Sequence, residues 1–437
     1  MLIEFAVTNF QSIRERQVLT FRADTNVGKQ DLPDNLITPV EKSHGSTLIN
    51  SAVLFGANAS GKSNFLEGLH ALQIMVKKSD DFKLDKAISL YKPFKLDKTS
   101  REKVTIFEIE FVAKDNIRYF YAVHFSKYTI EKEVLGFYPN ERTTVRKSLL
   151  FSRNADLTLE FGEYYRGKQD FTVNPNQLIL AKAGVAHPSI VEAYRFFSTY
   201  LYYAPAHSLA FDEAILANAE KYLSMEQPNF SKAMVSLVRA GDTGISDIFI
   251  QRLGAETLKF PDDMPDDEKQ KIIARYRNRI KTVHPIYQNG ELVGEEVFDI
   301  DEESTGTAKL LGLSGLVVDA LHDGSTIIVD ELDKNLHPLL SRMMIELFQN
   351  PEQNPKNAQL IFSSHDISLI DKKLFRRDQI YLVDKNTEGS STVTRLSEFT
   401  GISKVETLQK WYLKGMFKGI PAINSYEINL NFAEENA

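Results

Sequence analysis

The sequence contains no cysteine, which excludes disulfide scaffolds, thiolate zinc sites and cysteine nucleophiles. It has no run of about 20 apolar residues, and its opening MLIEFAVTNF lacks the basic and apolar regions of a signal peptide. Positive charge is in deficit, with 52 basic against 59 acidic residues and a net charge of −7. This balance disfavours a globally basic nucleic-acid binder and leaves only a local basic patch open. We expect a cytoplasmic protein without membrane contact.

What is present fits a folded globular protein. Apolar residues make up 43% of the chain and charged residues 25%, which argues against disordered and fibrous classes. At 437 residues the chain is about three times as long as a usual domain. A large core with a second lobe, inserted or appended, is therefore expected.

Hydrophobic periodicity indicates both strands and helices. Residues 2–7 and 17–22 alternate apolar and polar side chains, and residues 104–161 contain further strands, which together predict an antiparallel β-lobe. Ser51–Phe55 is an apolar run typical of a buried strand, and a helical pattern follows it. From residue 300 onward helices alternate with strands, which predicts a parallel sheet with its site at the carboxyl ends of the strands.

The middle of the chain has a different character. Residues 187–238 contain long helical patterns, and residues 261–281 place acids before bases in an order that suits a helix dipole. Asn289-Gly290 between apolar residues predicts a hairpin turn. We therefore expect four parts: an ATPase-head segment with the phosphate loop (1–80), the β-lobe (81–186), a helical insertion with a hairpin (187–300), and the rest of the head (301–437).

The segment GANASGKS, from Gly56 to Ser63, matches the phosphate-binding loop G-x-x-x-x-G-K-S. Gly56 and Gly61 allow backbone N–H groups to converge on phosphate oxygens, and the helix that follows adds its partial positive charge. Lys62 is expected to reach the β- and γ-phosphates, and the Ser63 hydroxyl to coordinate Mg²⁺. The flanking apolar strand and amphipathic helix argue against an accidental match.

Acidic and histidine motifs follow two later apolar strands. Asp330 and Glu331 end the run TIIVDE, and an acid pair at a strand exit suits Mg²⁺ chemistry, with Glu331 polarising the attacking water. Taken alone, a solvated acid pair is an equal interpretation. His365 in SSHD can donate a hydrogen bond to a γ-phosphate or cap the next helix, and His337 is interpreted as structural.

The run Glu303-Ser-Thr-Gly-Thr opens a helix with small residues and a glycine, which makes a second anion-binding helix end. One triphosphate does not need two such ends in one chain. The second end is therefore a candidate for closing over nucleotide held by another copy, and an ordinary helix cap is the alternative.

Taken in order, these motifs resemble ABC-type ATPases of the SMC, RecF and OLD-related kind within the AAA-like set. The Walker A run is GANASGKSN, the signature ESTGT, the Walker B and D-loop TIIVDELDKNLHP, and the switch SSHD, and the opening TNFQSI fits as well. The runs ESTGTAKLLGL, AQLIFSSHD, RRDQIYLVDKN and WYLKGMFKGIP, and Leu237–Ile248, resemble bacterial abortive-infection ATPases more closely. The implied fold is an α/β P-loop NTPase head of the ABC-ATPase type with a mixed sheet, an antiparallel β-lobe and an inserted helical subdomain.

The resemblance also implies roles for individual residues. Glu331 is the catalytic base and His365 the switch, while Ser63 and Asp330 hold Mg²⁺. No residue between 64 and 300 is assigned to the glutamine loop. Nucleotide contacts fall to Gly56, Asn58, Ser60, Gly61, Lys62, Ser63, Asn64 and the D-loop residue Asp333, with Ser304 and Gly306 supplied by a second copy.

The function implied is an ATP-driven switch with ATP and Mg²⁺ as cofactors. Two nucleotides would join a homodimer, with higher oligomers open, and hydrolysis would release it. The chain would regulate a separate effector in anti-phage defence, such as a TOPRIM-type nuclease, because only about seventy residues follow His365, too few for a further catalytic domain. The sequence shows no long heptad segment that would form a coiled-coil arm.

Two other functions are kept open. A RecF-like repair or end-sensing ATPase would bind duplex DNA directly, and a nucleotide-gated scaffold would turn over negligibly. Residues 80–300 and Trp411–Pro421 are candidate docking surfaces, although Trp411 fits core packing equally well. Candidate DNA contacts, which also suit a solvated basic surface, are Arg275, Arg277, Arg279, Lys281, Arg376 and Arg377.

Overall fold

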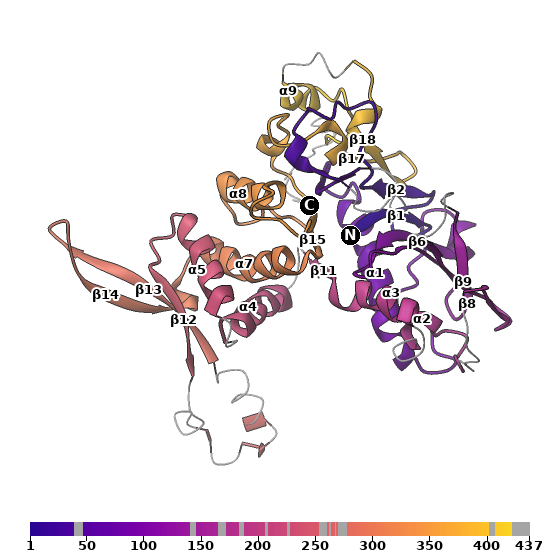
Figure 1. The fold of residues 1–437 in the computed structure, drawn as a ribbon, viewed down its shortest axis with the longest axis horizontal. Helices are drawn as coiled ribbons and strands as arrows, with labels where there is room; N and C mark the ends of the chain where they lie inside the picture. The colour runs from indigo at the N-terminus through magenta and orange to yellow at the C-terminus, as the bar shows by residue number, and fades with distance from the viewer. Residues whose placement is uncertain are drawn as a thin grey trace, which may run out of the picture.

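The fold is seen in a computed structural model of the chain, in which two large sheets lie on either side of helix α1 (Figure 1). A group of helices and a three-stranded sheet extend to the left of this body (Figure 1). The structure describes residues 1–38, 47–139, 146–164, 172–182, 188–205, 209–224, 228–252, 260–261, 264–266, 268–269, 278–401 and 407–421.

A six-stranded sheet carries the nucleotide motifs. Its order is β11-β15-β16-β5-β17-β18, and every neighbouring pair is parallel except β17 and β18. Ala52 and Leu54 of β5 face the core that contains α1, whereas Val53 and Phe55 face the core that contains α7 and α8. The predicted mixed α/β head is confirmed. The strands are β5 (Ser51–Phe55), β11 (Leu201–Ala204), β15 (Thr326–Val329), β16 (Gln359–Ser363), β17 (Ile380–Lys385) and β18 (Ser391–Arg395).

A seven-stranded antiparallel sheet forms the predicted β-lobe. Its order is β10-β9-β8-β7-β6-β1-β2, so the first two strands of the chain pair into the same sheet as the strands after residue 104. Phe5 and Phe107 from this sheet meet Phe65 of α1 in one core. The strands are β1 (Leu2–Thr8), β2 (Gln17–Thr20), β6 (Thr105–Val112), β7 (Arg118–Phe125), β8 (Ile130–Tyr138), β9 (Ser148–Asn154) and β10 (Leu159–Phe161).

The helices cover both faces of the six-stranded sheet. α1 packs on one face with α3, while α7 and α8 pack on the other, and α4 and α5 lie against α7. Their apolar faces follow the spacing seen in the sequence. The helices are α1 (Lys62–Lys78), α2 (Ile179–Lys182), α3 (Pro188–Thr199), α4 (Leu209–Ser224), α5 (Pro228–Ala240), α7 (Thr305–Asp323), α8 (Pro338–Gln349) and α9 (Leu408–Leu413), with 3₁₀ turns at Pro33–Asn35, Ser79–Asp81, Ser100–Glu102, Ile300–Glu302, Ile367–Leu369, Arg377–Gln379 and Leu396–Glu398.

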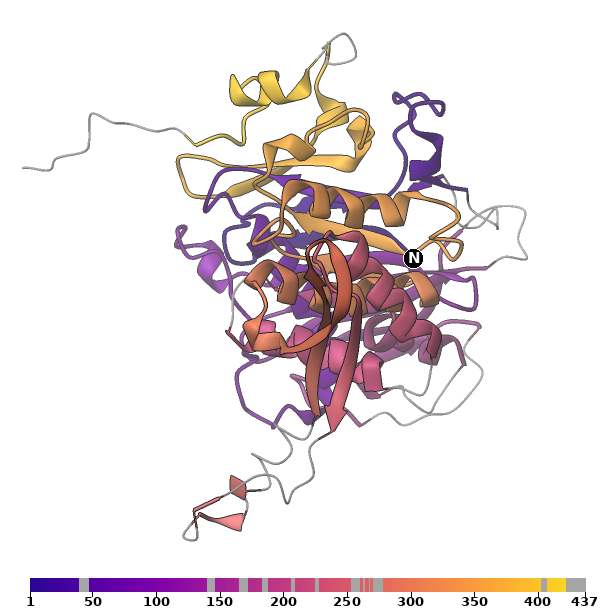
Figure 2. The ribbon, with the colours of Figure 1, turned by 90° about the vertical axis from the view of Figure 1, so that its left-hand side faces the viewer.

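A three-stranded sheet, ordered β12-β13-β14, protrudes beyond α5 (Figures 1 and 2). The predicted turn at Asn289-Gly290 is confirmed, with φ values of 54° and 86°. The helix expected over 261–281 is wrong at its end, because residues 278–281 begin β13, and most of the preceding stretch lies outside the described residues. The strands are β12 (Asp247–Arg252), β13 (Asn278–Gln288) and β14 (Glu291–Asp299), and a separate pair is β3 (Leu36–Ile37) with β4 (Leu48–Ile49).

The C-terminal segment packs back onto the head. Tyr412 of α9 lies beside Phe55 with ring centroids 6.4 Å apart, and its hydroxyl donates to the Gly419 carbonyl. Trp411 stacks on Phe417, which supports the packing interpretation of this tryptophan. Among the described helices, none is long and apolar enough to cross a bilayer.

Candidate functional site

The phosphate loop joins β5 to α1, as predicted. A Cβ at Gly56 would collide with the Val383 carbonyl, and one at Gly61, whose φ is 110°, would collide with the Ser391 hydroxyl. Both positions therefore need glycine. Gly61 is also the N-cap of α1 and offers no side chain to the first N–H groups, which stay available to an anion.

Lys62 lies inside this loop and is 5% exposed. Its Nζ donates to the carbonyls of Gly56 at 2.9 Å and Ala57 at 3.2 Å. Burial lowers the pKa of Lys62 to about 8, although the nearby carboxylates of Asp330 and Glu331 oppose this shift. The ammonium is thus held at the loop by neutral acceptors that phosphate oxygens can replace.

Nucleotide affinity is expected to fall in alkaline solution because of this pKa. Below pH 8 the Lys62 amine is mostly charged, and above it the charge is lost. Between pH 7.5 and pH 9.5, where ATP stays fully ionised, ATP affinity should weaken by roughly tenfold or more. Isothermal titration at both pH values measures this. Lys62→Arg, which stays charged, should show no such pH dependence; equal affinities for the wild-type chain would contradict the assignment.

The two acids after β15 are fixed by the neighbouring strand β16. Asp330 is 4% exposed, and its Oδ1 accepts from the Ser363 hydroxyl at 2.5 Å. The same hydroxyl oxygen accepts from the Glu331 backbone N–H at 2.8 Å. Glu331 has a φ of 53°, an uncommon left-handed conformation for a residue with a side chain. The interpretation as a freely solvated acid pair is therefore wrong for Asp330.

His365 follows the same edge of the sheet. Its backbone N–H donates to Asp333 Oδ2 at 3.2 Å, and its Nε2 lies 3.9 Å from Glu331 Oε1. Burial lowers the pKa of His365, and the Lys62 ammonium lowers it further, while the carboxylates oppose them. The ring is thus neutral near pH 7 and can donate one hydrogen bond. Asp366, not His365, caps the following 3₁₀ turn.

The ESTGT loop lies against the D-loop of the same chain. Ser304 is the N-cap of α7 and accepts from the Thr307 N–H at 3.1 Å, so the expected helix cap is present. A Cβ at Gly306 would lie 2.8 Å from the Asn335 carbonyl, which requires glycine there. Lys309 donates from the next turn to the Glu331 carbonyl at 3.0 Å. Ser304 and Gly306 are exposed or half-buried and have no contact with the phosphate loop among the described residues.

The donor set suits a magnesium–triphosphate complex. Ser63 lies half-buried in the first turn of α1, Asn58 is exposed on the loop, and the buried Ser60 hydroxyl has no hydrogen-bond partner among the described residues. Within that part of the chain, no group of three or more acidic or histidine side chains can hold a metal alone. Mg²⁺ would depend on the Ser63 hydroxyl, the Asp330 carboxylate, phosphate oxygens and water, all of which it prefers.

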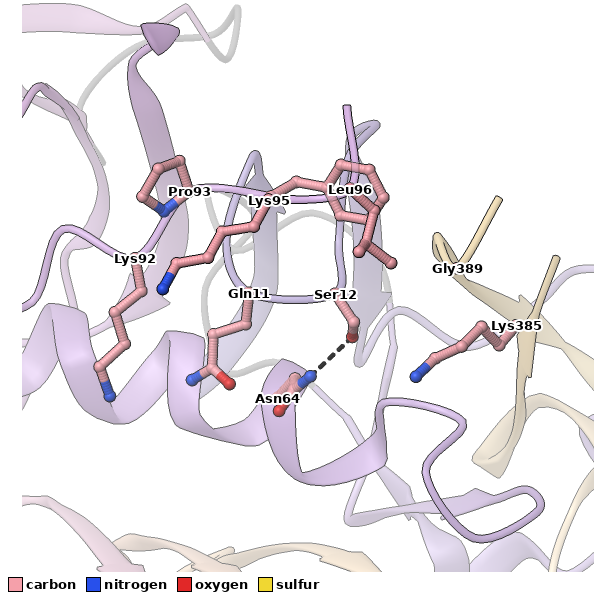
Figure 3. A pocket seen from close by; sticks show the side chains of 10 residues that line it. Gln11, Ser12, Asn64, Lys92, Pro93, Lys95, Leu96, Lys385 and Gly389 are labelled. Atoms are coloured by element: carbon pink, nitrogen blue, oxygen red, sulfur yellow. Dashed lines mark hydrogen bonds between the residues drawn. The ribbon is translucent and has the colours of Figure 1, made fainter. Parts of the chain in front are cut away.

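Two cavities flank the loop. One of about 420 Å³ is enclosed by Gly56, Asn58, His365 and Tyr412, among others. The other, of about 360 Å³, lies beside the first turn of α1, where Asn64 donates to the Ser12 hydroxyl at 2.7 Å (Figure 3). Figure 3 shows side chains from three separate segments around this second cavity, among them Lys92, Lys95 and Lys385.

Residues 51–371, about three quarters of the sequence, match the family model described as "AAA domain, putative AbiEii toxin, Type IV TA system". The chain belongs to this family. The predicted resemblance to abortive-infection AAA ATPases is confirmed. None of the curated proteins matches the sequence.

Solved structures similar to this AAA protein are remote in sequence. An SMC head bound to the C-winged helix domain of ScpA is 14% identical, with 92% of this chain and 99% of that chain covered and a TM-score of 0.43. The SMC head domain from Thermotoga maritima is 12% identical, with coverages of 90% and 98% and a TM-score of 0.39. RecF with ATP is 12% identical, with coverages of 90% and 97% and a TM-score of 0.36.

Several candidate DNA contacts of the AAA protein are engaged elsewhere. Arg376 is 2% exposed, so its assignment to a DNA surface is wrong. Arg279 and Lys281 lie on a strand, and both form ion pairs with Asp299. Arg377 is half-buried and donates to the Asn26 carbonyl. Arg275 and Arg277 lie outside the described residues.

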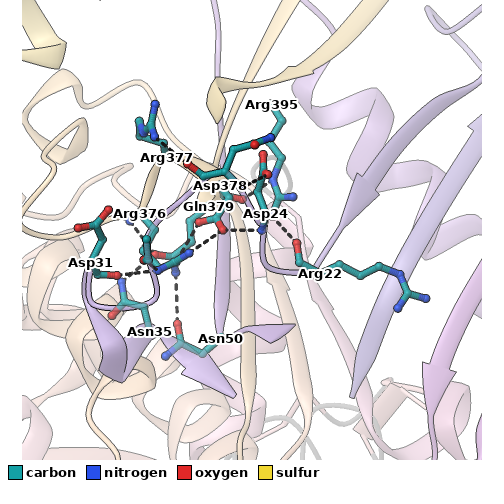
Figure 4. Close-up of polar contacts among 12 residues, drawn as sticks. Arg22, Asp24, Asp31, Asn35, Asn50, Arg376, Arg377, Asp378, Gln379 and Arg395 are labelled. Carbon is teal, nitrogen blue, oxygen red and sulfur yellow. Dashed lines mark hydrogen bonds and ion pairs between the residues drawn. The ribbon is translucent and has the colours of Figure 1, made fainter. Parts of the chain in front are cut away.

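Arg376 instead holds the N-terminal segment onto the head (Figure 4). Its guanidinium donates to both carboxylate oxygens of Asp378 at 3.0 and 2.9 Å. It also donates to the carbonyls of Gly28 and Asp31 at 2.8 and 2.7 Å. Asp378 accepts in turn from the Asp24 backbone N–H. This buried pair is thus fully hydrogen-bonded on the guanidinium side facing the loop.

Arg376→Ala is expected to destabilise the AAA protein by about 3–5 kcal/mol, because it leaves the Asp378 carboxylate buried without its charge partner. Urea unfolding followed by circular dichroism measures the loss. Arg377→Ala, beside it but partly exposed, should change stability by less than about 0.5 kcal/mol. Similar effects of the two substitutions would contradict the account of this network.

Sequence reasoning missed four residues that position the site. Ser363 and Ser12 lie inside motifs that were noticed, SSHD and TNFQSI, but their contacts depend on neighbouring strands. Lys309 and Ser391 carry no local signal. Ser391 donates to the Ser60 carbonyl at 2.6 Å and so braces the loop from β18.

Proposed function

We propose that this chain binds and hydrolyses ATP with Mg²⁺ and uses the nucleotide to control its own dimerisation. The observation that supports this most directly is the convergence of Lys62, Asp330, Glu331 and His365 at one edge of the six-stranded sheet. Parallel strands bring the ends of β5, β15 and β16 together there, which is where such sheets bind ligands.

Each residue has a part in the proposed reaction. Lys62 and the open N–H groups of α1 hold the β- and γ-phosphates, and Mg²⁺ on Ser63 and Asp330 neutralises their charge. Glu331 accepts a proton from the water that attacks the γ-phosphorus, and ADP leaves with the electron pair of the broken bond. Neutral His365 donates a hydrogen bond to the γ-phosphate, and Asp333 holds the His365 backbone in place.

The second copy would close the site with its ESTGT loop. Support comes from the position of Ser304 and Gly306 at the open start of α7, where N–H groups favour an anion. Lys309 and Gly306 tie this start to the backbone at Glu331 and Asn335. Nucleotide held by one copy would thus affect the catalytic segment of the other through α7.

We further propose that the dimer controls a separate effector protein in defence against phage, for which a TOPRIM-type nuclease is the candidate. The support is the family description, which names abortive-infection and toxin–antitoxin proteins. A dimer favoured by ATP can hold or release an effector only through different affinities of the two states for it.

Magnesium dependence tests the proposed chemistry. Phosphate release by the purified chain should require Mg²⁺ and stop in EDTA, and Ser63→Ala should reduce it by about tenfold or more, because the metal loses an oxygen ligand. Ser79→Ala, at the far end of α1, is the matched control and should leave turnover unchanged. Full turnover in EDTA would contradict the proposal.

A further inference from the structure

The hairpin of β13 and β14, here called the arm, extends away from the helices around it (Figures 1 and 2). β12 pairs with β13 only from Asn278 to Val283, so beyond Val283 the arm is a two-stranded ribbon. A two-stranded ribbon is marginally stable in water by itself. Its length, bulge and regular register up to Gln288 nevertheless make it a built element of the fold.

The distal arm exposes large apolar side chains on both strands. Tyr287 and Leu292, paired across the turn, are each 63% exposed, Val293 is 54% exposed and Val297 46%. Single exposed apolar residues are ordinary, but a cluster of this kind on a protruding ribbon marks an interaction surface. β14 is moreover the outer strand of its sheet within the described residues, so its outward backbone groups can accept another strand.

The charge of the arm limits what can cover it. Between His284 and Phe298 the arm carries Glu291, Glu295 and Glu296 and neither lysine nor arginine. Within the described chain none of these glutamates forms an ion pair. Nucleic acid and anionic lipid would be repelled by such a surface.

A second copy of the chain is disfavoured as well. Two β14 strands paired with each other would place two sets of three glutamates on one ribbon, and like charges across a strand pair are destabilising. The occupant that fits is an extended segment of a different protein, with apolar side chains for the ribbon and basic side chains for the glutamates.

The arm is rooted at the predicted nucleotide-sensing loop. β14 runs into the 3₁₀ turn at Ile300–Glu302, and Glu303 and Ser304 follow directly. Glu303 Oε1 lies 2.7 Å from His284 Nε2 and also accepts from the Thr282 hydroxyl, both on β13. The base of the arm and the start of α7 are therefore one hydrogen-bonded unit.

We infer that the arm is the docking site for the effector protein, which adds a lysine- or arginine-bearing strand to the outer edge of β14. This inference rests on the proposed function, because that proposal supplies the separate effector chain. It adds the surface used and the chemistry of the segment that binds there.

The test uses fluorescein-labelled eight-residue peptides as stand-in strands, with fluorescence polarisation on the full chain. A peptide alternating lysine and valine should bind, and one alternating glutamate and valine should not. Glu291→Lys combined with Glu295→Lys and Glu296→Lys should weaken lysine-peptide binding by about tenfold or more. The matched control reverses three exposed glutamates on other elements, Glu102, Glu160 and Glu352, and should leave binding unchanged.

Hydrogen exchange locates the contact. The lysine peptide should protect amides of β14, and a version with N-methylated valines, which lacks backbone donors, should neither bind nor protect. Equal binding of the two peptides, no effect of the arm reversal, or protection elsewhere would overturn the inference, as would dimerisation of the nucleotide-free chain through Leu292. Binding of a fluorescent ATP analogue is measured separately: its absence with intact peptide binding would overturn the proposed function and leave the arm as a peptide site.

Discussion

Lys62→Ala is expected to weaken ATP binding by about a hundredfold or more. The Lys62 ammonium is the one positive side chain that donates into the loop, with Gly56 and Ala57 as its acceptors in the described structure. Charge-assisted hydrogen bonds to two phosphates contribute roughly 1.5–3 kcal/mol each, which corresponds to this loss in affinity. Isothermal titration with ATP and Mg²⁺ measures it.

Lys77→Ala is the matched control for this substitution. Lys77 is an exposed lysine in the last turn of the same helix, so it tests for a general effect of charge on α1. Its ATP affinity should equal that of the unchanged chain. Thermal unfolding of both variants shows whether the fold is intact. Wild-type affinity in a folded Lys62→Ala protein would contradict the phosphate site.

Glu331→Gln is expected to lower the rate of ATP hydrolysis by about a hundredfold or more while ATP still binds. An amide of the same shape keeps the backbone bond to Ser363 but cannot accept the proton of the attacking water. Loss of a general base typically costs 10²–10⁴ in rate. Phosphate release at saturating ATP measures turnover, and titration of the same sample confirms binding.

Glu352→Gln, an exposed glutamate on the loop after α8, should hydrolyse ATP at the unchanged rate. Unchanged turnover in Glu331→Gln would remove this residue from the reaction. Negligible turnover already in the unchanged chain, with ATP bound, would favour the nucleotide-gated scaffold over an enzyme.

The parts of the site that the sequence predicts are those encoded in short stretches of chain. The phosphate loop is one such stretch, because a buried strand, two required glycines and an amphipathic helix follow each other from Ser51 to Lys78. Asp330 and His365 are likewise marked by the apolar strands before them. Parallel pairing of those strands then brings the motifs together.

Contacts between distant segments are beyond such patterns. Arg376 and Arg377 look alike in sequence, yet only Arg376 turns inward to Asp378, and only the packing of the N-terminal segment decides this. Lys309 shows no motif, because its acceptors at Glu331 and Lys334 lie on another element. Its role needs the tertiary fold.

Charge order alone also proved a weak signal. The acid-to-base order over 261–281 suits a helix dipole, but residues 278–281 pair with β12 and β14 instead. Dipole terms amount to about 1 kcal/mol or less, so strand pairing outweighs them. The glutamine-loop position was left open for a related reason. β11 lies beside β15, and Pro205 follows it at the same sheet edge, which only the strand order shows.

The central claim is that two copies jointly hold ATP between the phosphate loop of one and the ESTGT loop of the other. Light scattering coupled to size exclusion tests it most directly on Glu331→Gln with saturating ATP and Mg²⁺. The account predicts a particle of twice the 49.6 kDa chain mass, which reverts to a single chain in ADP or when Ser304→Arg is added. A particle of one chain mass in ATP, in a protein that binds the nucleotide, would contradict it.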